Sequence, residues 1–188
     1  MHFTFVSDHV ALDFAATLTW RTSYPIELLT EPADLAAWAV QAGLTDDPGQ
    51  VTRAALERAL LLREAVYRTA VAAERGAQAD AADVRLIRER ASGPQVTVAL
   101  QALGRVERRG DIEQVMATVA TRAGELFGGD DRHLVRPCAG STCTRLFLDR
   151  SRAGSRRWCD KLSCGSRANA TAYRRRRKAA SGPDPRTD

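Results

Sequence analysis

The sequence predicts an α+β fold in two parts: a mostly helical N-terminal domain with a small antiparallel sheet, then a cysteine-rich module that ends in a basic helix. Three observations support this prediction. Apolar residues recur at helical spacing through much of residues 1–130. Only a few short runs rich in β-branched residues interrupt them. All four cysteines lie near the C-terminal end, as two C-x4-C pairs separated by fifteen residues.

Helices dominate the expected structure of residues 1–130. Thr30 is placed to cap a helix that Gly43 ends, and Asp111 is placed to cap an amphipathic helix. Met116 lies on the apolar stripe of that helix and is expected in the core. The expected elements are helices over 30–42, 51–74, 80–90 and 111–127, strands over 3–6, 95–100 and 104–109, and an apolar stretch over 10–20 that suits either state.

The chain length of 188 residues suits one medium domain followed by a small appendage. Residues 1–130 are long enough to bury a core, whereas residues 131–180 are too few and are expected to depend on metal. Residues 128–131 are the expected linker, and 181–188 a disordered tail. No stretch has the roughly 18–20 apolar residues that span a bilayer, and the start has no basic leader, so we expect a cytoplasmic protein without a membrane partner.

The four cysteines are predicted to bind one zinc ion. Each close pair can wrap one edge of a tetrahedron, and zinc prefers thiolate ligands. Four thiolates close the coordination sphere, so the ion is expected to be structural. Two disulfides in a secreted protein are the alternative, which the missing signal peptide disfavours. The expected ligands are Cys138, Cys143, Cys159 and Cys164.

The module around these cysteines is predicted to be a treble-clef-like zinc finger with four cysteine ligands. Residues 134–136 and 144–148 are expected as two strands, joined by the turn that holds the first cysteine pair. The second pair leads into a helix that begins at Cys164 and runs to the end of the module. Phe147 and Trp158 are expected to pack its small core.

Basic residues gather in the same module. Residues 132–178 carry fourteen basic and two acidic residues, a net charge of +12, whereas residues 1–131 carry thirteen basic and nineteen acidic residues, a net charge of −6. This asymmetry predicts a polyanionic partner. A solvated helix end is the plainer explanation, but it accounts for only part of the charge. We expect contacts with double-stranded DNA from Arg156, Arg157, Arg167, Arg174, Arg175, Arg177 and Lys178.

Several functional alternatives stay open. Arg167, in the first turn of the predicted helix, could brace the anionic zinc site or bind a phosphate. RNA or a protein is the alternative partner. An enzyme is not expected, because the three histidines show no catalytic spacing and every cysteine has a metal role. A homodimer would suit DNA half-sites, but no pattern reveals an interface, and no ligand-binding residues are identified.

The run CAGSTCTRLFLDRSRAGSRRWCDKLSCGSRANATAYRRRRK resembles the CGNR zinc finger. It shares the paired cysteines, an F-x-D-x-S segment, an RRWC segment and a CGxR box, in which Ser166 replaces the Asn of the family name. The stretches VALDFAATLTWR and PADLAAWAVQAGL are similar to the ABATE domain that precedes this finger in bacterial proteins, although Ala16 stands where relatives commonly have Asn. The resemblance implies a stress-related transcription regulator whose finger binds DNA. Our leading hypothesis adds an N-terminal domain that senses a small molecule, dimerises, or both.

Overall fold

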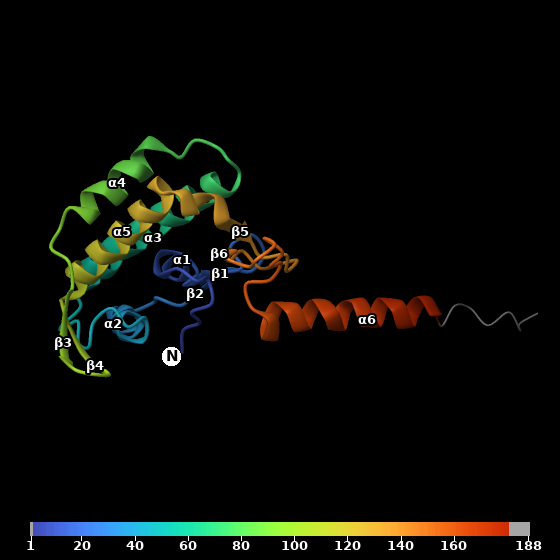
Figure 1. Cartoon of the computed structure of the whole chain (residues 1–188), viewed down its shortest axis with the longest axis horizontal. Coiled ribbons are helices and arrows are strands. Elements are labelled where there is room, and N and C mark those ends of the chain that lie inside the picture. Colours follow the sequence, from blue (N-terminus) through green and yellow to red (C-terminus); the bar gives the residue numbers. More distant parts are fainter. Residues whose placement is uncertain (1, 181–188) are drawn as a thin grey trace, which may run out of the picture.

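The computed structural model of the chain describes residues 2–180, so the tail expected over 181–188 lies outside the described residues. It confirms a mixed fold of helices and small antiparallel sheets (Figure 1). The helices are α1 (Val10–Ala15), α2 (Pro32–Gln41), α3 (Arg53–Glu74), α4 (Ala81–Ala91), α5 (Ile112–Gly128) and α6 (Ser166–Ala180). The strand pairs are β1 (Leu18–Thr19) with β2 (Ile26–Glu27), β3 (Thr97–Ala102) with β4 (Arg105–Arg109), and β5 (Val135–Pro137) with β6 (Leu146–Leu148).

The main core lies where α1, α3 and α5 pack together, with α4 covering α3 and α5 (Figure 1). Trp38 of α2 and Phe14 of α1 are fully buried, with ring centroids 4.9 Å apart. Met116 is buried in the same core, as its place on the apolar stripe of α5 predicted. Within residues 2–180, no helix is both long and apolar enough to cross a membrane.

Side-chain caps set the beginnings of the long helices. Thr52 Oγ1 accepts from the backbone N–H of Ala55 at the start of α3, and Asp111 does the same for Gln114 at the start of α5. The cap of α2 is Glu31, one residue later than predicted. The hydroxyl of Thr30 instead donates to Asp34, whose carboxylate also accepts the backbone N–H groups of residues 30 and 31.

The strand expected over residues 3–6 is absent, which corrects that prediction. Side chains provide the acceptors for several backbone amides here. The amide of Phe3 donates to Gln41 Oε1, and the amides of Val6 and Ser7 both donate to Asp13 Oδ1. The ambiguous stretch over residues 10–20 forms α1 and then the short strand β1.

The C-terminal module shares an apolar core with the helical domain. The 3-10 helix η1 (Asp130–Leu134) follows α5 directly, so the residues expected as a linker are ordered. The backbone N–H of Asp149 donates to the carbonyl of Leu134, and Arg150 pairs with Asp131 at 2.6 Å. The buried members of the shared core are Leu12, Ala70, Leu126, Val135, Leu146 and Leu148.

Candidate metal centre and basic helix

Four separate segments bring the cysteines together. Cys138 directly follows β5, and Cys143 lies in the turn before β6. Cys159 comes from the loop after β6, and Cys164 from η2 (Lys161–Gly165), a π-helical turn that leads directly into α6. The predicted order of a strand pair followed by a turn that opens a helix is therefore present, although α6 begins at Ser166, two residues after the fourth cysteine.

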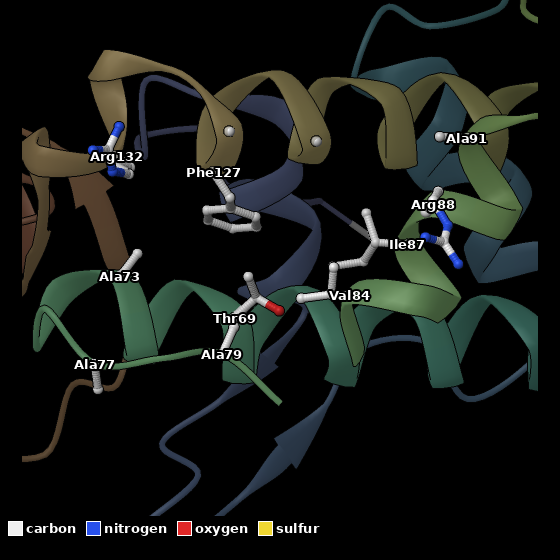
Figure 2. Close-up of a pocket in the computed structure, with 12 residues that line it drawn as sticks. Thr69, Ala73, Ala77, Ala79, Val84, Ile87, Arg88, Ala91, Phe127 and Arg132 are labelled. Carbon is white, nitrogen blue, oxygen red and sulfur yellow. The ribbon is translucent and has the colours of Figure 1, made fainter. Parts of the chain in front are cut away.

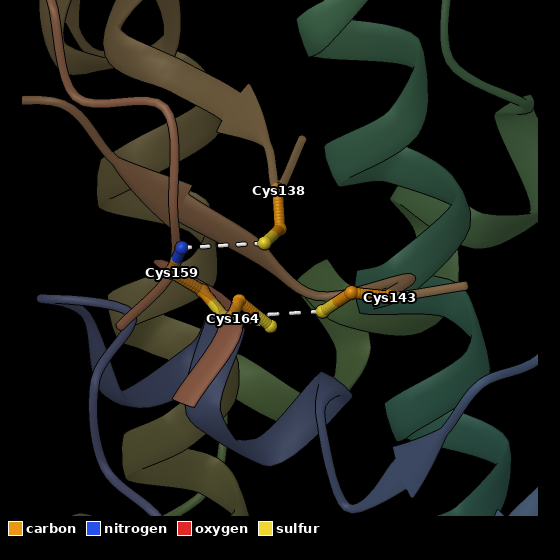
Figure 3. A group of neighbouring side chains, drawn as sticks. All are labelled: Cys138, Cys143, Cys159 and Cys164. Atoms are coloured by element: carbon orange, nitrogen blue, oxygen red, sulfur yellow. Dashed lines mark hydrogen bonds between the residues drawn. The ribbon is translucent and has the colours of Figure 1, made fainter. Parts of the chain in front are cut away.

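The sulfur atoms have the spacing of a tetrahedral zinc site (Figure 3). All four lie within 4.8 Å of one another. Cys159 Sγ is 3.8 Å from Cys143 Sγ and 3.7 Å from Cys164 Sγ. A tetrahedron with Zn–S bonds of about 2.3 Å has edges of about 3.8 Å. A disulfide needs about 2.05 Å, so these cysteines are free thiols that can hold one zinc ion.

Thiols packed this closely compete for protons when no ion is bound. Hydrogen bonds from the side chains of Cys143 and Cys159 hold the pKa of Cys138 well below its ordinary value. The bond to Cys138 raises the pKa of Cys143 to about 11 and also raises the pKa of Cys159. Four thiolates cannot coexist here without a cation, so the donor set fits a divalent ion.

Two features of the local sequence allow the close approach of the cysteines. A Cβ on Gly140 would lie 3.1 Å from the Cβ of Cys143, a tight contact, and 3.5 and 3.6 Å from the sulfur atoms of Cys164 and Cys138, so glycine lets the turn pass close to the cysteines without displacing them. The carboxylate of Asp160 caps η2 by accepting the backbone N–H groups of Leu162 and Ser163. The hydroxyl of Ser166, at the family's Asn position, donates to the carbonyl of Lys161.

Arg167 braces the metal centre. Its Nη2 lies 3.2 Å from Cys164 Sγ, and this contact raises the pKa of the guanidinium above its usual range. A cation beside a zinc thiolate offsets part of the site's negative charge. Arg167 also lines a groove described below, and a guanidinium has five N–H donors, so the bracing contact does not use all of them.

The neighbouring arginines 156 and 157 have different surroundings. The guanidinium of Arg156 donates to the carbonyls of Val6, Trp158 and Cys159, and also pairs with Asp8. These bonds tie the zinc finger to the N-terminal segment and occupy the side chain. DNA contact by Arg156 stays a prediction, and its contacts support a structural role. Arg157 is exposed, with its guanidinium 5.2 Å from the ring of Trp158.

Helix α6 extends away from the rest of the molecule (Figure 1). The side chains of Arg174, Arg176 and Arg177 are exposed, and Arg177 lies over the ring of Tyr173. The side chains of Arg175 and Lys178, both predicted to contact DNA, lie outside the described part of the structure.

A groove of about 640 Å³ separates the cysteine turn from α6. Arg167, Arg174 and Arg176 line it on one side, and Ser141 and Thr142 on the other, without an acidic residue among its lining. The sequence prediction omitted Arg176, because it lies off the helical stripe that carries Arg174. The available signal was its place within the run of five basic residues.

The geometry defines a zinc-finger protein, in which a helical N-terminal domain supports a four-cysteine module and a basic helix. Two protein families match the sequence in the same order. Residues 8–130 match ABATE, described as "Putative stress-induced transcription regulator", and residues 135–177 match the CGNR zinc finger. The chain therefore belongs to the ABATE family and carries a CGNR zinc finger. No curated protein matches it.

Proposed function

We propose that the protein is a transcription regulator that binds double-stranded DNA through the zinc finger and α6. The observation that carries this proposal is the position of α6, which projects from the metal centre with exposed arginines along it. A helix of this kind can lie against phosphates or enter the major groove, which admits an α-helix.

Zinc has a structural role in this proposal. When bound, it links the cysteine turn to the residues that precede α6, and so fixes the direction of the helix. The protein's own side chains then make the contacts. Arg167, Arg174 and Arg176 in the groove, with Ser141 and Thr142 opposite, suit a phosphate group. An arginine on a helix of this kind can also bond a guanine edge, the commonest specific contact.

Binding without catalysis is part of the same proposal. The closed set of four cysteines leaves no position for a substrate at the metal. A bacterial regulator of this type would work in the cytoplasm, where the DNA lies.

RNA is the second candidate partner, because exposed arginines along a helix also bind single-stranded or folded RNA. A homodimer would match DNA half-sites one helical turn apart.

The experiment is a salt titration of binding to duplex DNA, using the zinc-loaded full chain. About five phosphate contacts would give a slope of log affinity against log salt of about −4.5. The double variant Arg174→Gln/Arg176→Gln should flatten the slope by about two units, whereas Arg85→Gln on α4 should leave it unchanged. An unchanged slope in the double variant would show that the groove does not bind phosphate.

A further inference from the structure

A second cavity lies in the helical domain. It has a volume of about 490 Å³, opens to solvent on one side and is lined mainly by α3, α4 and α5 (Figure 2). Phe127 of α5, Ile87 and Val84 of α4 and Thr69 of α3 surround its central space. A volume of this size, with mostly apolar walls, is typical of a site for a small organic molecule.

Thr69 provides a polar group in the wall that the protein does not satisfy. The residue is buried, and its hydroxyl has no hydrogen-bond partner within the described residues. Buried hydroxyls are normally paired, and an unpaired one costs stability. Because a threonine in a helix has two accessible χ1 positions, its hydroxyl can turn toward a polar atom placed in the cavity.

The charged groups in the lining are both cationic. Arg88 and Arg132 line the cavity, and no acidic residue does. Arg88 is exposed and makes no ion pair with any residue in the described part of the chain. Arg132 is half-buried. Its Nη1 donates to the carbonyl of Gly129 at 2.7 Å and lies 4.0 Å from the exposed carboxylate of Asp130, which leaves Nε and Nη2 without a hydrogen bond among the described residues. The lining therefore favours an anion.

Two glycines of α5 keep part of this space open. Gly124 and Gly128 are one helical turn apart and both line the cavity. A Cβ at either position would meet no atom within 4 Å, so local crowding does not require glycine there. A glycine inside a helix makes that helix less stable than an alanine would. At residue 124, the glycine preserves open space in the cavity.

The cavity also adjoins the connection to the zinc finger. Arg132 belongs to η1, which leads directly into β5 and Cys138. The neighbouring Asp131 pairs with Arg150 of the finger. A molecule bound to Arg132 would restrain the segment from which the first metal ligand extends.

We infer that this cavity binds a small apolar acid, whose hydrocarbon body lies between Phe127 and Ile87 and whose carboxylate pairs with Arg132. Arg88 adds to the positive potential, and the Thr69 hydroxyl bonds a polar atom of the ligand. That this ligand regulates DNA binding rests on the proposed function. That the cavity binds the ligand does not.

The test is calorimetric titration of the zinc-loaded full chain with three probes of one shape: 2-naphthoate, 2-naphthamide and 2-naphthylmethylammonium. Naphthoate should bind with a stoichiometry of one and at least tenfold more tightly than the other two. Arg132→Gln should weaken the affinity for naphthoate at least tenfold, and Arg88→Gln should weaken it about threefold. Arg85→Gln, on the same helix as Arg88 but outside the lining, should have no effect.

Two substitutions of Gly124, one large and one small, distinguish a filled cavity from a misfolded protein. Gly124→Leu should abolish naphthoate binding because its side chain fills part of the cavity. Gly124→Ala should keep most of the naphthoate affinity. Circular dichroism of both variants checks that α5 is intact. Failure of naphthoate to bind, equal binding of the ammonium probe, or unchanged binding by a folded Gly124→Leu variant would overturn the inference. These titrations are done without DNA. Their outcome is therefore independent of whether the protein binds DNA.

Discussion

Substitution of Arg156 and Arg157 separately tests whether these neighbours have different roles. Arg156 Nη2 donates to the carbonyls of Val6 at 2.6 Å and Cys159 at 2.5 Å, and its Nε donates to Trp158 at 3.0 Å. Bonds from a charged donor are worth more than neutral ones, and each contributes about 1 kcal/mol here after allowance for the part of the side chain that solvent reaches. The ion pair with Asp8 adds little, because that carboxylate is half exposed.

Arg156→Ala should therefore lower the free energy of unfolding by about 3 kcal/mol. Arg157→Ala should change it by less than about 0.5 kcal/mol, because Arg157 is exposed. Urea unfolding of the zinc-loaded protein measures both. Binding to duplex DNA should show the reverse order: Arg157→Ala reduces the salt slope by about one unit. Equal stability of the two variants, or loss of DNA contact from Arg156→Ala while the finger remains folded, would refute this assignment of roles.

Three further predictions concern stability. Chelation of zinc should unfold the C-terminal module and leave the N-terminal helices largely intact, because structural zinc contributes about 10–16 kcal/mol of apparent binding free energy; an amide spectrum of residues 135–177 that chelator leaves unchanged would contradict this. Leu148→Ala should cost about 2–5 kcal/mol, since its side chain is fully buried in the shared core, whereas the exposed Leu103→Ala should be nearly neutral in the same urea titration. His9 caps α1 as a hydrogen-bond acceptor, and its burial lowers its pKa from the ordinary value of 6.5. Just below pH 6.5, the folded state therefore binds fewer protons than the unfolded state. The stability should therefore fall as pH drops below 6.5, and His9→Asn should lose that part of the dependence; identical pH profiles would refute it.

Patterns local in sequence predicted much of the fold. Cysteine spacing identified all four residues of the metal cluster, because ligands in close pairs constrain the chain locally. Asp111 marked the start of α5, since capping depends on only three or four residues. Two β-rich runs predicted β3 and β4, although Gly104, expected in the second strand, lies in the turn between them with φ +79°.

Features that depend on tertiary contacts could not be predicted. Residues 3–6 have strand-like composition, but the bonding of Val6 and Ser7 to the Asp13 carboxylate depends on how α1 folds back. Composition equally cannot tell which arginine of an adjacent pair points inward, as Arg156 does. The cavity needs three helices and η1 to meet, and residue 124 appeared in the sequence only as a glycine inside a helix.

The most direct test of the regulatory account is selection of genomic fragments by the zinc-loaded full chain, followed by affinity for the selected duplex, a scrambled duplex and single-stranded RNA at several salt concentrations. A specific regulator should select fragments with a shared sequence and prefer that sequence to the scrambled duplex by more than about 10³-fold. Equal affinity for all three nucleic acids, with the same steep salt slope, would contradict this prediction and leave α6 as a general polyanion-binding surface.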